Sequence, residues 1–169
     1  MNLLLIRHGI AEDRFEFAKR ATNDDERPLT DKGIARMREG SKGLRRLVPS
    51  LDVLASSPLT RARQTADVVQ KAYGSPRPMI AEALSPGREP EEIADWLGLL
   101  PADATVAAIG HEPDLSELVG WLTTGERHGF VEMKKGGACL LEITGSPRAC
   151  SARLEWLLTP RQLRLLAGE

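Results

Sequence analysis

Residues 3–9 read Leu-Leu-Leu-Ile-Arg-His-Gly, a run of apolar side chains followed at once by two basic ones. The apolar run is too short for a helix and does not alternate with polar residues, which predicts a strand buried on both faces of a sheet. It is also too short for the core of a signal peptide or a membrane span. We therefore expect the fold to be built around this strand, with Arg7 and His8 at its carboxyl end.

Predicted strands and helices alternate along the rest of the chain. Further strands are expected at 52–56, 79–81, 104–109, 138–143 and 152–156, and helices at 30–47, 59–73, 90–97, 113–122 and after 160. Residues 10–30 are polar and predicted to be irregular. The alternation predicts an α/β fold, a three-layer sandwich with a mostly parallel central sheet. The last two strands are too close for a helical crossover, which predicts an antiparallel edge strand.

Size and composition restrict the class of protein. The 169 residues suffice for one domain, expected to span 1–169, and the net charge of -1 gives no reason to expect a nucleic-acid or membrane partner. Cys139 and Cys150 lack C-x-x-C spacing, so we expect reduced thiols and a cytoplasmic location. No His, Cys or Asp cluster has the spacing of metal ligands, so no metal or other cofactor is expected.

Basic side chains follow three of the predicted strands. Arg7 and His8 follow the first, Arg61 lies just beyond the second, and His111 follows the strand at 104–109. Parallel sheets bind ligands beyond the carboxyl ends of their strands. A lone histidine there is more simply a capping or packing residue, but this set of side chains needs an anion. A tetrahedral phosphoryl group fits, because guanidinium and imidazolium donors can hold its oxygens.

Histidine can also be the nucleophile toward phosphorus. A neutral imidazole nitrogen attacks the phosphorus atom and divides one displacement into two easier steps. The other ring nitrogen must then keep its proton, which we expect it to donate to a nearby backbone carbonyl. Gly9 would let the backbone approach the phosphate closely, although an ordinary strand-to-loop turn explains Gly9 equally well.

Four segments together resemble the signatures of the histidine phosphatase (phosphoglycerate-mutase-like) superfamily. They are R-H-G at 7–9, P-L-T-x-x-G at 28–33, S-S-P-L-x-R-A-x-Q-T at 56–65 and G-H at 110–111. They occur in the family's order and span nearly the whole chain. The resemblance implies a phosphoglycerate-mutase-like fold and a metal-independent phosphatase.

The resemblance also implies roles for individual residues. His8 would be the phosphorylated nucleophile, and Arg7, Arg61 and His111 would complete the phosphate pocket. Ser57 is a weaker candidate phosphate ligand, because a helix-capping role explains it at least as well.

The general acid is the least defined role. Many members of the family supply a carboxylate after the third strand, where Glu82 stands, although an exposed loop glutamate is an equally good interpretation of Glu82. Glu112 is a poorer candidate, because a carboxylate there also favours a helix N-terminus.

Within the superfamily, the chain resembles the phosphohistidine phosphatases of SixA type. The resemblance lies in the short length and in the stretches at 82–87, 110–113, 134–138 and 156–160, whereas the charged segment at 12–27 is longer. Little chain remains to close over a small substrate, so we expect an open site that accepts a phosphorylated side chain of another protein. The leaving imidazole of phosphohistidine can take its proton from solvent, so the reaction tolerates a weak acid.

The expected function is therefore hydrolysis of protein phosphohistidine through a covalent intermediate on His8. A phosphatase of small phosphomonoesters, such as sugar phosphates or nucleotides, is the nearest alternative. A phosphate-binding module without turnover is a more distant one.

Overall fold

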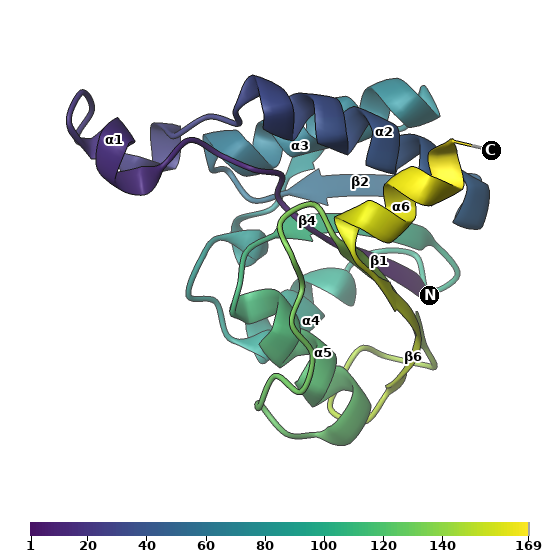
Figure 1. Cartoon of the computed structure of the whole chain (residues 1–169). Helices are drawn as coiled ribbons and strands as arrows, with labels where there is room; N and C mark the ends of the chain where they lie inside the picture. Colours follow the sequence, from purple (N-terminus) through teal and green to yellow (C-terminus); the bar gives the residue numbers. More distant parts are fainter. Residues whose placement is uncertain (169) are drawn as a thin grey trace.

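The first predicted strand lies in the middle of a six-stranded sheet in the computed structural model, which describes residues 1–168 (Figure 1). Strand β1 (Asn2–Arg7) pairs in parallel with β4 (Thr105–Gly110) and antiparallel with β5 (Ala138–Ile143). The other strands are β2 (Val53–Ser56), β3 (Met79–Ile80) and β6 (Ala152–Leu158). Residue 169, the last of the predicted domain, lies outside the described residues.

The strand order confirms a mostly parallel sheet with an antiparallel edge. The order is β3-β2-β4-β1-β5-β6, in which β1 to β4 run parallel and β5 and β6 form an antiparallel pair. The strand that runs against the others is β5, which lies second from the edge. The short connection between β5 and β6 permits only this pairing.

Helices cover both faces of the sheet, which confirms the three-layer sandwich. Helices α2 (Asp31–Leu47), α3 (Thr60–Tyr73) and α6 (Pro160–Ala167) lie on one face, and α4 (Pro90–Leu97) and α5 (Asp114–Thr124) on the other (Figure 1). The sheet therefore has a hydrophobic core on each face. Because successive strand residues point to opposite faces, Leu4 and Ile6 of β1 belong to the core under α2, α3 and α6, and Leu3 and Leu5 belong to the core under α4 and α5.

Local signals in the sequence fix most helix ends. The Thr30 hydroxyl accepts a hydrogen bond from the N–H of Gly33 at 2.9 Å and caps α2, as the sequence predicts. Gly74 ends α3 in the left-handed conformation, with φ of 84°. Helix α4 has the predicted bounds, because Pro90 occupies its first turn.

The prediction of an irregular segment at 10–30 is wrong for residues 14–18. Helix α1 (Arg14–Ala18) forms there, because the Asp13 carboxylate accepts hydrogen bonds from the N–H groups of Phe15 and Glu16. A 3-10 helix, η1 (Asp24–Glu26), follows. Both helices are too short to produce a hydrophobic period in the sequence.

Two further predictions concern the cysteines and the membrane. Cys139 and Cys150 are both free thiols, the first buried and the second exposed. Among residues 1–168, no helix is long and apolar enough to cross a membrane.

Candidate active site

The carboxyl ends of the parallel strands open into one cleft of about 560 Å³. Arg7 ends β1 and His8 follows it, Arg61 lies in the first turn of α3, and His111 directly follows β4; all four line the cleft. The other wall residues are Ala11, Glu12, Asp13, Arg14, Phe15, Arg27, Pro86, Glu112 and Lys135. The structure thus brings together the four side chains that the sequence places at separate strand ends.

The two histidines lie next to each other at the bottom of the site. Their ring centroids are 5.1 Å apart, with an angle of 51° between the ring planes. His8 Nδ1 lies 2.8 Å from the backbone oxygen of Gly9. A carbonyl oxygen only accepts hydrogen bonds, so Nδ1 carries the proton of the neutral ring and Nε2 carries the lone pair. This is the arrangement that a nucleophilic histidine requires.

Burial keeps both imidazoles neutral. It lowers the pKa of His8 to about 4, with smaller effects from the charges of Arg61 and Arg7, against the opposing hydrogen bond to the Gly9 carbonyl. Burial also lowers the pKa of His111 to about 3, with His8 as the next largest cause. At neutral pH the free site therefore has two uncharged rings among positively charged arginines.

Several buried polar atoms of the cleft residues have no hydrogen-bond partner among residues 1–168. These atoms are Arg7 Nε, Arg61 Nε, His111 Nδ1 and Glu112 Oε1. A buried donor without a partner costs about 1–3 kcal/mol, and native proteins rarely leave one without a functional reason. Arg7 and Arg61 each use Nη1 within the protein, on Met133 and Asp24, and guanidinium groups with further donors beside a cleft fit an anion such as a phosphoryl group.

Ser57 and Gly9 contact the two histidines but do not line the cleft. The hydroxyl of Ser57 lies 2.9 Å from His111 Nε2 and accepts a hydrogen bond from the N–H of Leu59 at 3.3 Å. The N–H of Gly9 donates to the hydroxyl of Thr65 at 3.0 Å. Ser57 takes neither of the two roles considered for it: it does not line the cleft, and α3 has Leu59 as its N-cap with no side-chain cap hydrogen bond. Its hydroxyl instead contacts the ring of His111.

The structure separates the two glutamates considered as general acids. Glu82 is exposed, accepts a hydrogen bond from the Ser85 hydroxyl at 3.2 Å and does not line the cleft. Glu112 does line it and is half-buried, and burial raises the pKa of its carboxyl group. The hydroxyl of Ser116 donates a hydrogen bond to Glu112 Oε2.

Sequence reasoning missed three basic residues of the wall, Arg14, Arg27 and Lys135. The Arg27 side chain is only 12% exposed, and its signal is its position directly before the P-L-T-x-x-G element. Lys135 reaches the cleft because the N–H of Gly136 donates to the carbonyls of Arg7 and His8, each at 3.1 Å. No pattern in the sequence indicates that contact.

The remaining motif residues hold the segment at 12–27 against the site. Ala11 and Leu29 form an antiparallel bridge that closes the base of this segment. The side-chain oxygen of Gln64 accepts a hydrogen bond from the N–H of Leu29 at 2.7 Å, which ties the bridge to α3. The P-L-T-x-x-G and Q-T elements therefore place the segment beside the catalytic candidates.

Metal ligands do not gather at this site or elsewhere in residues 1–168. No group of three or more His, Cys, Asp or Glu side chains there could hold a metal ion.

Comparison with known proteins identifies the family. The sequence model of the histidine phosphatase superfamily (branch 1) matches residues 3–85, which include the first three of the four signature segments. The chain belongs to the histidine phosphatase superfamily. It is accordingly a phosphatase of that superfamily, with its candidate nucleophile in the first matched segment.

This histidine phosphatase is similar to known proteins in sequence and in structure. An uncharacterized protein of Picosynechococcus is 35% identical over 139 residues, which cover 81% of this chain and 82% of that protein. The protein histidine phosphatase SixA, solved in complex with tungstate, matches 96% of this chain and 99% of its own, with a TM-score of 0.82 and 24% identity.

A second solved structure with the same fold is that of a phosphatase with a different substrate in its name. A mutant phosphoserine phosphatase of Entamoeba histolytica, in complex with phosphoserine, matches 96% of this chain and 98% of its own, with a TM-score of 0.69 and 17% identity. These likenesses establish the phosphoglycerate-mutase-like fold of this histidine phosphatase. They do not by themselves select a substrate.

Proposed function

We propose that this histidine phosphatase hydrolyses phosphohistidine in proteins through a covalent intermediate on His8, without a metal ion. The observation that carries the proposal is the His8 side chain itself. Its Nδ1–H is fixed on the Gly9 carbonyl, and its Nε2 lone pair is available in a cleft that Arg7 and Arg61 make positive. Residues 1–169 would form one phosphatase domain.

The first step transfers the phosphoryl group to the enzyme. The Nε2 lone pair of His8 attacks phosphorus, a new P–N bond forms, and the P–N bond of the substrate phosphohistidine breaks. The two guanidinium groups stabilise the charge on the phosphoryl oxygens. The substrate imidazole leaves with a proton taken from solvent, so the enzyme needs no strong acid for this substrate.

The second step returns the enzyme to its starting state. A water molecule attacks the phosphorus of phosphorylated His8, the P–N bond breaks, and inorganic phosphate leaves. The electron pair of that bond returns to Nε2, and the proton of the water passes to phosphate or solvent. Nδ1 keeps its proton throughout.

His111 would change its charge when the phosphoryl group binds. A nearby negative charge favours the protonated imidazole, so a bound phosphoryl group raises the pKa of His111 from its low value of about 3. The protonated ring would then donate a hydrogen bond to a phosphoryl oxygen. Ser57 holds the ring in place for this role.

The exposed rim of the cleft favours a protein as the substrate. The cleft wall includes Arg14, whose side chain is 73% exposed, and Phe15, which is 80% exposed. A phosphorylated side chain on another protein could reach His8 past such a rim, whereas a small metabolite gains little from it. The high structural similarity to SixA agrees with this choice.

Glu112 favours a second candidate function, the hydrolysis of small phosphomonoesters. Alkoxide leaving groups need a proton donor, and a carboxyl group in the cleft wall with a raised pKa is suited to supply one. The phosphoserine phosphatase with the same fold agrees with this alternative. Glu82 would need to move into the cleft to take this role.

A side-by-side assay separates the two functions. Initial rates are measured on a phosphohistidine peptide, phenyl phosphate, sugar phosphates and nucleotides, for the wild type and for Glu112→Gln and Glu82→Gln. We expect the highest kcat/KM on the peptide, little changed by either substitution. Turnover of a small phosphomonoester without turnover of the peptide would select the second function. Phosphate binding without turnover of any substrate would leave only a binding module.

A further inference from the structure

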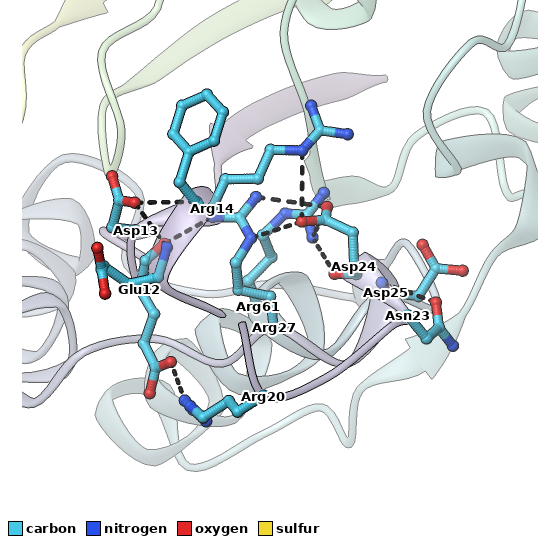
Figure 2. Close-up of polar contacts among 11 residues, drawn as sticks. Glu12, Asp13, Arg14, Arg20, Asn23, Asp24, Asp25, Arg27 and Arg61 are labelled. Carbon is cyan, nitrogen blue, oxygen red and sulfur yellow. Dashed lines mark hydrogen bonds and ion pairs between the residues drawn. The ribbon is translucent and has the colours of Figure 1, made fainter. Parts of the chain in front are cut away.

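The guanidinium group of Arg61 contacts the charged segment at 12–27 as well as the cleft (Figure 2). Its Nη1 donates hydrogen bonds to the backbone oxygen of Asp24 at 3.1 Å and to the carboxylate Oδ2 of Asp24 at 3.3 Å. The side chain of Arg61 is 8% exposed and that of Asp24 is 32% exposed. This partly buried ion pair therefore joins a candidate catalytic arginine to a loop that sequence analysis left without a role.

The same carboxylate contacts two further arginines of the cleft wall. Arg27 donates to Asp24 Oδ1 from Nε at 2.8 Å and to Oδ2 from Nη2 at 3.4 Å, and Arg14 Nε lies 3.7 Å from Oδ1. The Arg27 hydrogen bond is the largest cause that lowers the pKa of Asp24, so the carboxylate is ionised at neutral pH. One negative charge thus contacts three guanidinium groups, two from the segment at 12–27 and one from α3 (Figure 2).

The backbone fixes Asp24 in this position. Asn23 caps the 3-10 helix η1, because its side-chain oxygen accepts a hydrogen bond from the N–H of Asp25 at 3.1 Å. Arg27 Nη1 donates to the carbonyl of Glu12 at 2.8 Å, which ties the end of η1 to the start of the segment. These hydrogen bonds hold the Asp24 carboxylate beside the arginines of the cleft wall.

We propose that Asp24 is a positioning residue that holds the Arg61 guanidinium in the orientation needed to bind the transferring phosphoryl group. This inference rests on the proposed function. A guanidinium group carries five N–H donors. Asp24 takes up Nη1 and Arg61 Nε is buried, so Nη2, which has no hydrogen bond among residues 1–168, remains for a phosphoryl oxygen.

The physical reason is preorganisation. Arginine has a long side chain with many rotamers, and an arginine that must first find its orientation loses part of its effect on the transition state. The Asp24 carboxylate, which accepts from Nη1, restricts the guanidinium to one orientation. Asp24 need not touch the substrate to have this effect.

A double-mutant cycle tests the inference. We measure kcat on phenyl phosphate for the wild type, Asp24→Ala, Arg61→Ala and the double variant, because a small substrate does not depend on docking against the loop. Asp24→Ala should lower kcat by about tenfold in the wild type but by less than about twofold in the Arg61→Ala background. Asp24→Asn, which keeps an amide oxygen as acceptor, should show an intermediate loss.

Asp25→Asn is the matched control. It removes a neighbouring charge that also acts on Arg61 but forms no ion pair within 4.0 Å among residues 1–168, so it separates loss of charge from loss of the contact, and it should change kcat by less than about twofold. Equal losses from Asp24→Ala in both backgrounds would overturn the inference, because Asp24 would then act independently of Arg61. Thermal unfolding of each variant identifies any loss of fold.

Failure of the proposed function would be visible separately. The same cycle is measured on the affinity for inorganic phosphate by calorimetry, which needs no turnover. The positioning role predicts that Asp24→Ala weakens phosphate binding more than Asp25→Asn does, and that this loss of affinity disappears in the Arg61→Ala background. That result would support the role even in a protein that hydrolyses nothing. An effect that persists without Arg61 would contradict it.

Discussion

His8 combines two properties that are uncommon in one side chain: it is almost fully buried, at 6% exposure, and it lines a cleft with four positively charged arginines. Both properties disfavour the imidazolium form. The structure therefore keeps the candidate nucleophile unprotonated under conditions in which an exposed histidine would already be partly charged.

The pH dependence of the rate tests this property. Only neutral His8 can attack phosphorus, and its pKa is lowered to about 4, so kcat/KM should keep its plateau down to about pH 5 and fall as pH drops through about 4. The measurement is kcat/KM on phenyl phosphate, corrected for the ionisation of the substrate and for any unfolding. An acidic limb centred near pH 6.5 would contradict the assigned environment of His8.

Arg61 should matter far more than the other arginine of its segment. Arg61→Ala removes a charge partner of the transition state, and we expect kcat to fall on the order of a hundredfold or more. Arg63→Ala is the control, because Arg63 is exposed on the same helix and does not line the cleft. A loss below about twofold for Arg61→Ala, measured in the same assay, would remove Arg61 from the site.

For single residues, the sequence predicts membership of the site where a strand fixes the position of the residue. Arg7, His8 and His111 lie at or directly after strand ends, so their convergence follows from a parallel sheet. Asp24 and Glu112 could not be assigned, because the first depends on how the loop folds onto α3 and the second on how far its side chain is buried.

At the scale of elements, the site depends on the close approach of α2 to the base of the 12–27 segment. A Cβ atom on Gly33 would lie 2.1 Å from the backbone oxygen of Ile10. The N–H of Thr30 donates to that same oxygen at 2.9 Å. Glycine at this point of the P-L-T-x-x-G element is thus required by packing of backbone against backbone.

Two alanine substitutions in α2 should have opposite signs. Gly33→Ala should lower the free energy of unfolding by about 1–3 kcal/mol, because the backbone must move to admit the methyl group. Gly40→Ala, whose Cβ would meet its nearest neighbour at 3.8 Å, should raise it by roughly 0.5–1 kcal/mol through helix propensity. Urea unfolding measures both. Equal effects of the two variants would disprove the close approach at Gly33.

Most elements could be predicted, and the exceptions have a common cause. Helix α4 has its predicted bounds because Pro90 and the acidic first turn mark its start. Helix α1 escaped prediction because five residues show no period, and only the Asp13 cap signals it. Short elements are specified by single hydrogen bonds, which a sequence pattern does not reveal.

At the scale of the whole molecule, the buried histidines couple stability to pH. The folded state holds His8 and His111 with pKa values of about 4 and about 3, below the value of 6.5 for an exposed histidine. Between about pH 4 and pH 6.5 the histidines bind more protons in the unfolded chain than in the folded protein. The free energy of unfolding therefore rises with pH in this window. The site therefore destabilises the fold in mild acid.

Urea unfolding at several pH values should reveal this coupling. The free energy of unfolding should fall as pH decreases from about 6.5 toward 4, by an amount on the order of a few kcal/mol for the two histidines together. His8→Gln should make the decrease shallower, because one of the two groups is removed. The same slope in the wild type and in His8→Gln would show that His8 is not held neutral by the fold.

The fold restricts the chemistry of this protein more than it restricts the substrate. The three-layer sheet and the cleft at its carboxyl edge follow from the alternation of strands and helices, and both agree with the family assignment. Proteins with the same fold include a protein histidine phosphatase and a phosphoserine phosphatase. We therefore expect substrate choice to depend on rim residues such as Arg14 and Phe15, whose positions cannot be predicted from the periodicity of the sequence.

Trapping of the phosphorylated enzyme is the most direct test of the account. The protein is mixed with a labelled phosphohistidine peptide and quenched in alkali, where a P–N bond survives, and the label is mapped by mass spectrometry. We expect one phosphoryl group on His8 in the wild type, and neither label nor turnover in His8→Ala. Near-normal turnover by His8→Ala, or a label on another residue, would contradict the account.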